Sequence, residues 1–117
     1  MNIRLTTTGR HSGEQREIPL YGWEDGERVV IVGSRGGSAR DPAWVHNLRA
    51  EPRATLKIGR QTRAVTAREV DGEERARLWE LVCEAFPLYA TYQRRTSRLI
   101  PLFVLEDGAA GTAPSDG

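Results

Sequence analysis

The stretch Val29–Leu48 reads VVIVGSRGGSARDPAWVHNL and is the part of the sequence that decides the fold. Its first four residues, Val29–Val32, are apolar and mostly β-branched, which predicts a buried strand. Three glycines follow within Gly33–Gly37, so backbone N–H groups there can approach a flat or anionic ligand closely. Asp41 and then Pro42 predict an N-cap residue and the first position of a helix. Strand, turn and helix N-terminus together form a candidate cradle for an anion or cofactor, although many glycine loops are only turns.

The length and composition indicate one soluble globular domain. The chain has 117 residues, of which 38% are hydrophobic and 28% charged, enough for one core. No stretch is long and apolar enough to span a membrane, and the first residues lack the apolar region of a signal peptide. The only cysteine, Cys83, lies in an apolar helical pattern and is expected to be a small buried hydrophobe. A disulfide framework is therefore excluded, and a cytoplasmic location is expected.

Charge is distributed unevenly along the chain. Residues 1–63 carry a net charge of +4 and the remaining residues a net charge of −3. The positive half contains the glycine-rich turn, which favours a small anionic ligand over a nucleic acid, because nucleic acids usually require a denser basic field. Arginines scattered over a solvated surface would give the same charge.

The remaining hydrophobic patterns predict an antiparallel sheet. Strands are expected at Arg4–Thr8, Glu17–Trp23, Val29–Val32, Ala54–Ile58, Thr62–Val70 and Ile100–Leu105. Helices are expected at Pro42–Ala50, between Asp71 and Pro87, and at Leu88–Thr96, with Glu74 closing a capping box on Asp71. Pro19 places the second strand at an edge or a bulge.

These elements predict a mainly β, α+β fold. About six mostly antiparallel strands with two or three short helices suggest a small closed or split β-barrel, and no strand–GxGxxG–helix unit supports a doubly wound sheet. Residues 1–106 are expected to form this single domain. Residues 107–117 are small and polar and are expected to be a disordered tail.

Familiar catalytic and metal-binding motifs are absent from the sequence. No Cys/His cluster has metal spacing, and no GxSxG or P-loop is present. If the protein is an enzyme, a cofactor is therefore expected to supply the reactive group. Arginine forks suit phosphate or carboxylate groups, and tryptophan and tyrosine suit a planar ring.

Three segments together resemble the deazaflavin-dependent nitroreductase family, which are actinobacterial split-barrel oxidoreductases that use coenzyme F420. They read LTTTGRHSGEQREIPLY, VVIVGSRGGSARDPAWVHNLRAEP and YATYQRRTSRLIPLFVLE, and they occur in the family's order from Leu5 to Glu106. The resemblance implies an FMN-binding-like split barrel that transfers hydride from reduced F420. Quinones, nitro compounds and other conjugated electrophiles are the implied acceptors.

The resemblance also assigns site residues. It implies that the cofactor's phosphate, acidic tail and ring are bound by Arg10, His11, Arg16, Pro19, Tyr21, Ser34, Arg35, Gly36, Gly37, Trp44 and Asn47. The substrate would be bordered by Phe86, Tyr89 and Tyr92, and the catalytic residues would be Tyr89, Tyr92 and Ser34. Two tyrosines three positions apart on one helix should project to the same side, although aromatic residues at this spacing are more often part of a core. The glycine-rich loop is expected on the surface, so that a side chain at Gly37 would remove binding and leave the protein folded.

The sequence departs from the family pattern at a few positions. His11 and Arg35 stand where lysine is usual, and both can keep a positive charge. Phe86 replaces a further tyrosine, which leaves the acceptor open. An N-terminal helix of some relatives is missing, and with it a segment that could face a membrane or cover the substrate.

Two other interpretations stay open at this point. One is a non-enzymatic split-barrel module that binds an anionic or apolar ligand such as a fatty acid or haem, and the other is an oxidoreductase that uses FMN. The partners expected for the enzyme are a small-molecule electron acceptor and no nucleic acid. A homodimer and a peripheral membrane contact through a quinone are further hypotheses.

Overall fold

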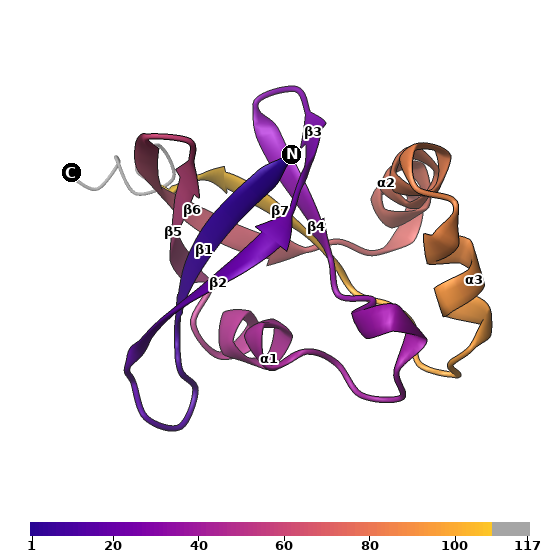
Figure 1. Cartoon of the computed structure of the whole chain (residues 1–117), viewed down its shortest axis with the longest axis horizontal. Coiled ribbons are helices and arrows are strands. Elements are labelled where there is room, and N and C mark those ends of the chain that lie inside the picture. Colours follow the sequence, from indigo (N-terminus) through magenta and orange to yellow (C-terminus); the bar gives the residue numbers. More distant parts are fainter. Residues whose placement is uncertain (109–117) are drawn as a thin grey trace.

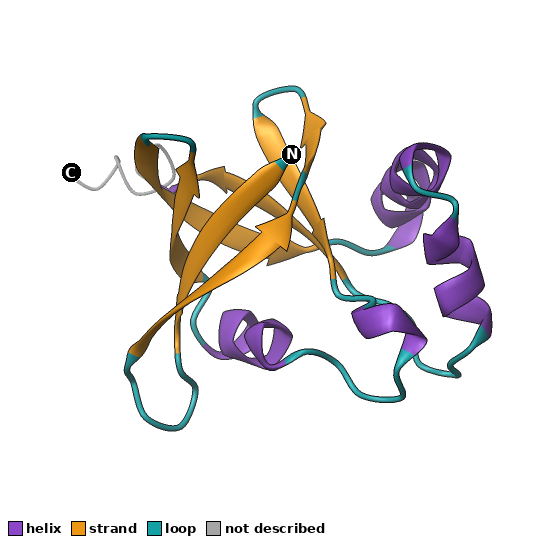
Figure 2. Ribbon diagram, viewed as in Figure 1, coloured by secondary structure: helices purple, strands orange, loops and turns teal. Residues whose placement is uncertain are grey.

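An antiparallel sheet of seven strands curls into a split barrel in the computed structural model, which describes residues 1–108. The strands are β1 (Asn2–Thr8), β2 (Gln15–Tyr21), β3 (Trp23–Asp25), β4 (Arg28–Val32), β5 (Arg53–Ile58), β6 (Gln61–Glu69) and β7 (Leu102–Asp107). The helices are α1 (Ala43–Ala50), α2 (Gly72–Ala85), α3 (Leu88–Arg94) and the short 3-10 helix η1 (Arg35–Gly37). The strand order is β2-β1-β5-β6-β7-β4-β3, with every neighbouring pair antiparallel (Figures 1 and 2). The predicted mainly β split barrel with three short helices is confirmed.

The sheet has one more strand than predicted because the second predicted strand bends at Gly22. The two outermost strands, β2 and β3, are consecutive in the chain and meet at this residue, so the sheet curls round until its edges join there. The Gly22 N–H donates a hydrogen bond of 2.8 Å to the Met1 carbonyl. A Cβ atom at Gly22 would lie 2.6 Å from Val29 Cγ1, so only glycine fits at the bend. Pro19 lies in the edge strand β2, as predicted.

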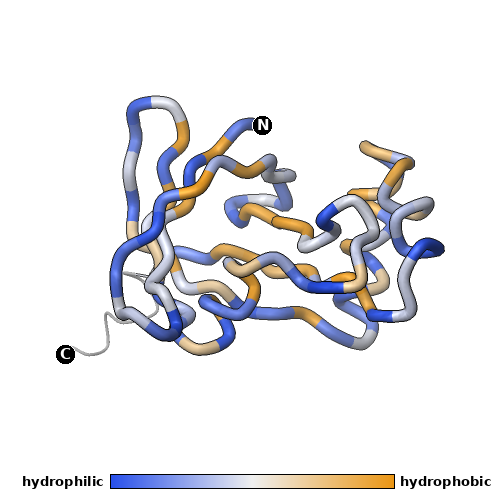
Figure 3. The backbone as a smooth tube through the Cα atoms, turned by 60° about the horizontal axis from the view of Figure 1, so that its bottom comes forward, coloured by the Kyte–Doolittle hydropathy of each residue, from blue (hydrophilic) through white to orange (hydrophobic). Residues whose placement is uncertain are grey.

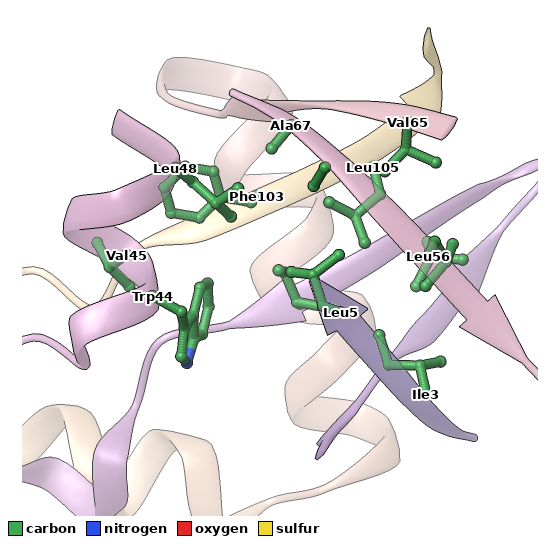
Figure 4. Close-up of a cluster of buried hydrophobic side chains, with 13 residues drawn as sticks. Ile3, Leu5, Trp44, Val45, Leu48, Leu56, Val65, Ala67, Phe103 and Leu105 are labelled. Carbon is green, nitrogen blue, oxygen red and sulfur yellow. The ribbon is translucent and has the colours of Figure 1, made fainter. Parts of the chain in front are cut away.

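Helix α1 closes one end of the barrel with its apolar face. Trp44, Val45 and Leu48 point from this helix into a cluster that includes Leu5 and Phe103 (Figure 4). The Trp44 and Phe103 rings lie edge to face at 5.9 Å. Apolar and polar residues alternate along the strands, as the bands of colour in Figure 3 show, so each strand turns its apolar side chains toward the cluster on which α1 packs. The barrel core therefore fixes the position of α1 beside the glycine-rich turn (Figure 1).

A second core forms on the outer face of β4 and β7. Val30 and Leu102 point away from the barrel interior and pack with Leu78 and Val82 of α2 and with Tyr89 of α3. Both faces of β4 are buried, which explains why residues 29–32 are a continuous apolar run rather than an alternating one. Helices α2 and α3 consequently stand beside the barrel and leave the glycine-rich turn between α3 and α1 (Figure 1).

Both predicted side-chain caps are wrong, although the helices lie where expected. Helix α1 begins at Ala43, after an extended Pro42, and the Asp41 carboxylate binds arginines instead of the helix N-terminus. Helix α2 follows Asp71, but the Asp71 side chain makes no capping bond. Glu74 is bound by arginines of the barrel and does not close a capping box. The arginine partners account for the side chains of Asp41 and Glu74, and nothing in the structure explains the missing bond of Asp71.

The end of the domain differs slightly from the prediction. Strand β7 runs to Asp107, one residue beyond the expected boundary at 106. Apart from its first two residues, the predicted disordered tail lies outside the described residues. None of the helices within residues 1–108 has the length and apolar character needed to cross a bilayer.

A network of three carboxylates and three arginines ties α2 to the barrel. Arg28 binds Asp25 at 2.6 Å, Glu74 at 3.1 Å and Glu106 at 3.3 Å. Arg68 binds Glu74 at 2.8 Å and Glu106 at 3.2 Å. The network therefore connects the β3–β4 turn, β6 and β7 with the first turn of α2.

This network predicts acid-sensitive stability. Hydrogen bonds from Arg77 and Arg28 lower the pKa of Asp25 from 3.8 to about 2, and bonds from Arg68 and Arg28 lower the pKa of Glu74 from 4.5 to about 2. Both carboxyl groups have a lower pKa in the folded than in the unfolded state, so their ionised forms stabilise the fold. This stabilisation is complete when the pH is above the unfolded-state pKa values, and it is lost as the pH falls through the folded-state pKa values. The melting temperature should therefore drop between about pH 5 and pH 2. Asp25→Asn should show a smaller drop, and a melting temperature that is constant over this range would contradict the prediction.

Candidate cofactor-binding site

The first hairpin turn and α1 enclose a pocket of about 430 Å³. The residues that line it are Thr7, Gly9, Arg10, His11, Ser12, Arg16, Ile18, Ala43, Trp44 and Asn47. Five predicted cofactor-binding residues, Arg10, His11, Arg16, Trp44 and Asn47, are thus brought to one place from two separate segments.

The turn is held against α1 by the side chain of Asn47. Its Oδ1 accepts a hydrogen bond of 3.0 Å from the Arg10 backbone N–H, and its Nδ2 donates one of 3.3 Å to Thr7 Oγ1. The Arg10 Nε donates a bond of 3.0 Å to His11 Nε2. The Asn47 amide is therefore occupied in fixing the turn, and the guanidinium of Arg10 is turned toward His11 at the mouth of the pocket.

A second pocket, of about 710 Å³, adjoins the first and shares Arg10 and Ala43 with it. Its lining adds Arg35, Ala39, Arg40, Asp41, Pro42, His46 and Arg98. We call the two pockets together the cationic groove. Within residues 1–108, the guanidinium groups of Arg10, Arg35 and Arg40 have no carboxylate partner. The single acid in the lining, Asp41, is bound to Arg98 and Arg49, so the groove keeps a positive field suited to an anionic ligand.

The backbone of residues 33–38, which we call the glycine loop, adjoins this groove through Arg35. Ser34 is in the right-handed helical region, and Arg35 and Gly36 have φ of 47° and 65°. A right-handed residue followed by a left-handed one makes a concave nest of N–H groups that binds negatively charged atoms. In the part of the chain that the structure describes, the N–H groups of Arg35 and Gly36 have no hydrogen-bond acceptor.

Gly37 lies inside the protein, so the expectation that it is a surface residue is wrong. Its φ is 83°, and a Cβ atom there would lie 2.8 Å from the Tyr92 carbonyl oxygen and 3.0 Å from Arg95 Cβ. The loop and α3 are packed together at this point. Gly36 has the same kind of backbone but open space around it, so a side chain there would meet no other atoms of the described residues.

The aromatic residues form a second feature beside the loop, the aromatic wall of Tyr21, Trp23, Phe86, Tyr89 and Tyr92. Ring centroids are 4.8 Å apart for Phe86 and Tyr89 and 6.4 Å apart for Tyr89 and Tyr92, which confirms that the two tyrosines project to one side. Tyr21 packs on Trp23 at 4.7 Å and is 48% exposed. The wall therefore joins the β2–β3 bend to α3.

Tyr89 and Tyr92 differ in their surroundings. Tyr89 is only 8% exposed, and its hydroxyl accepts a hydrogen bond of 3.2 Å from Trp23 Nε1. Burial raises the pKa of Tyr89. Tyr92 is half-buried, and its hydroxyl makes no hydrogen bond within residues 1–108. These contacts favour the core interpretation for Tyr89 and leave Tyr92 available to a ligand.

Pro19 is not brought into the groove. It lines a different pocket beside β1 and β2, with Arg4 and Lys57. Sequence reasoning also missed two residues of the site, Trp23 and Arg98. Trp23 lies two residues after the end of the quoted PLY segment, and Arg98 lies in the quoted YQRRTSR segment, where nothing in the sequence distinguishes it from Arg94 and Arg95.

Comparison with known proteins gives consistent results. A profile of the family described as F420H(2)-dependent quinone reductase matches residues 2–107. The F420H(2)-dependent quinone reductase Rv1261c of Mycobacterium tuberculosis is 40% identical over 107 residues, which cover 89% of this chain and 72% of that protein. The solved structure of an F420-H2 dependent reductase (FDR-A) has a TM-score of 0.82 and 42% identity, covering 90% of this chain and 93% of that one. A solved domain-swapped dimer has the same TM-score and identity and covers 90% of this chain and 79% of its own.

Proposed function

Because the chain belongs to the F420H(2)-dependent quinone reductase family, we propose that it is an oxidoreductase that uses reduced coenzyme F420 to reduce a quinone. The observation that carries this proposal is the continuity of three features. The cationic groove reaches the glycine loop at Arg35, one of the two loop residues whose N–H groups have no acceptor among the described residues, and the loop packs on the helix that bears the aromatic wall. A long ligand with an anionic end and a flat ring would fit these three neighbouring surfaces, with its anionic end in the cationic groove and its ring at the glycine loop and the aromatic wall.

The residues present fit F420. Arg10, His11 and Arg16 would bind its phosphodiester and acidic tail, since charge-assisted bonds to arginine are among the strongest in proteins. The N–H groups of Arg35 and Gly36 would bind the polar edge of the deazaflavin ring. When bound, reduced F420 supplies the hydride.

Other predicted residues receive narrower roles in this proposal. Asn47 holds the turn that carries Arg10, and Trp44 forms the apolar floor of the groove from its buried position. Ser34 supplies the right-handed residue of the nest, while its carbonyl is bound within the protein. Tyr21 would lie along the cofactor through the aromatic wall, and Pro19 would contribute only through the shape of β2.

The acceptor would lie against Phe86 and Tyr92. Their rings are 6.4 Å apart and form an apolar surface next to the glycine loop. The Tyr92 hydroxyl would donate a hydrogen bond to the acceptor oxygen that gains charge as hydride arrives. The same surface suits nitro compounds and other conjugated electrophiles, which we propose as a second class of acceptor.

The two tyrosines should respond differently to loss of the hydroxyl. Tyr89→Phe leaves the Trp23 indole N–H without its acceptor and should lower the free energy of unfolding by about 1–3 kcal/mol with little change in kcat. Tyr92→Phe should lower kcat and leave both the melting temperature and the affinity for F420 nearly unchanged. Melting curves and steady-state kinetics on the same preparations measure both effects. The reverse pattern would return the catalytic role to Tyr89.

Steady-state oxidation of reduced F420 tests the proposed function. We expect turnover with quinones, weaker turnover with nitroaromatics, and none when reduced FMN replaces reduced F420. Turnover with FMN alone would identify a flavin enzyme. Tight binding of haem or a fatty acid without any turnover would identify a binding module.

Partners and location follow from the proposed acceptor. We propose that the protein acts in the cytoplasm and contacts a membrane only where its quinone is dissolved in the bilayer. The solved domain-swapped dimer at 42% identity supports a homodimer as a further proposal. Sedimentation with and without phospholipid vesicles tests both.

A further inference from the structure

Arg98 makes more polar contacts with the glycine loop than any other side chain among the described residues. Its Nε donates to the Ser38 carbonyl at 2.7 Å, its Nη1 to the Gly33 carbonyl at 3.1 Å and its Nη2 to the Ser34 carbonyl at 2.7 Å. Its Nη1 also binds Asp41 Oδ1 at 2.6 Å, and the side chain is only 14% exposed. One guanidinium therefore holds the two ends of the loop and Asp41, two residues before α1.

These bonds determine which way the peptide groups of the loop point. A peptide carbonyl and the N–H of the next residue point in opposite directions, so a carbonyl held by Arg98 turns the following N–H away from Arg98. The Ser34 carbonyl precedes the Arg35 N–H, and that N–H is one of the two without an acceptor in residues 1–108. Arg98 thus accounts for the direction of at least this donor, which points away from the Arg98 guanidinium.

Gln93 connects Arg98 to α3, the helix that bears Tyr92. Its Nε2 donates to the Arg98 carbonyl at 2.7 Å, and its Oε1 accepts from the Ile100 N–H at 3.0 Å. These two bonds fix the backbone on either side of Leu99 against α3. Together with the contact between Gly37 and the Tyr92 backbone, they make the glycine loop and α3 one unit.

We propose that Arg98 is a positioning residue for the cofactor. With Asp41 as its counterion, it holds the glycine loop in the conformation whose N–H groups bind the ring, and it sets the distance between that loop and the aromatic wall. This inference rests on the proposed function, because it concerns the binding of F420.

The test compares Arg98→Ala with Arg49→Ala, using equilibrium titration with F420. Arg49 is the matched control, since it also pairs with Asp41, at 3.2 Å, but bonds to no carbonyl of the loop. Arg98→Ala should raise the dissociation constant for F420 by about tenfold or more, as expected for loss of several charge-assisted bonds. Arg49→Ala should change it by less than about twofold, the size of effect usual for exposed ion pairs.

Addition of free guanidinium ion separates positioning from general stability. We expect millimolar guanidinium, far below denaturing concentrations, to restore much of the affinity of Arg98→Ala and to leave Arg49→Ala unchanged. If Arg98→Ala does not fold, Arg98→Lys is titrated in its place. We expect the same loss of affinity, since one ammonium cannot replace the planar fork.

The outcomes distinguish this inference from the function on which it rests. Wild-type protein that binds no F420 would overturn the proposed function. Wild-type protein that binds F420 together with an Arg98 variant of unchanged affinity would overturn the inference alone. A folded Arg98→Ala whose weakened binding does not respond to guanidinium would also overturn it.

Discussion

Arg10→Ala should raise the dissociation constant for F420 by about tenfold or more, because one charge-assisted hydrogen bond is worth about 1.5–3 kcal/mol. Arg10 lies at the junction of the two pockets and has no carboxylate partner among the described residues, so its full charge is available to the ligand. Arg16→Ala should act in the same direction but less strongly. Glu14, 3.4 Å from the Arg16 guanidinium, already neutralises part of its charge.

The control for this prediction is Arg60→Ala. Arg60 is an exposed residue in the turn between β5 and β6 and lines neither pocket of the groove. The Arg60→Ala variant loses the same net charge as Arg10→Ala, so any general electrostatic effect on F420 affinity should appear in both variants. Titrations at low and high salt should show that the native affinity falls with salt and that the Arg10→Ala affinity depends on salt less steeply. Equal affinities for native protein, Arg10→Ala and Arg60→Ala would remove the first turn from the site.

Gly37→Val should destabilise the fold rather than act on the cofactor alone. The left-handed backbone costs a β-branched residue about 1–3 kcal/mol, and the overlap with the Tyr92 backbone adds a further cost of about 1–3 kcal/mol. The sum is a large part of the stability of a small domain, about 5–15 kcal/mol. We expect a clear drop in the midpoint of denaturant unfolding. A native midpoint would mean that the loop and α3 are not packed as described.

At Gly36, next to Gly37, an alanine substitution separates the effect on F420 binding from the effect on stability. Gly36 and Gly26 both have φ of 65° and open space around them, but Gly26 lies in the β3–β4 turn, away from the groove. Both alanine variants should lose about 1–2 kcal/mol of stability from left-handed strain. Only Gly36→Ala should also weaken F420 binding, because its methyl group would stand beside the open N–H groups. Equal affinities of the two variants would contradict the assignment of the nest.

Local sequence patterns predicted the strands and the two hairpins well. Alternation and turn residues are short-range signals, whereas the pairings of β1 with β5 and of β4 and β6 with β7 join strands that are distant in the chain. The bend at Gly22 was missed because its cause is the approach of Val29, which no local pattern reveals. The capping roles predicted for Asp41 and Glu74 were wrong for the same reason. The partners of Asp41 and Glu74 include Arg98 and Arg28, which are distant in sequence.

The candidate site was predictable in part. The family resemblance placed Arg10, His11 and Arg16 together, and the structure brings them to one pocket with Trp44 and Asn47. The resemblance could not separate Tyr89 from Tyr92, since the difference lies in Trp23, which is 66 positions from Tyr89. Arg98 was missed because its role depends on the carbonyl directions of a loop distant in sequence.

Equilibrium titration of the native protein with F420, with FMN as a competitor, tests the central claim most directly. The claim is that the cationic groove and the glycine loop form one site for this cofactor. It predicts saturable binding of F420 that weakens as salt is added and that an equal concentration of FMN does not displace. Absence of F420 binding, or its displacement by FMN at equal concentration, would contradict the claim.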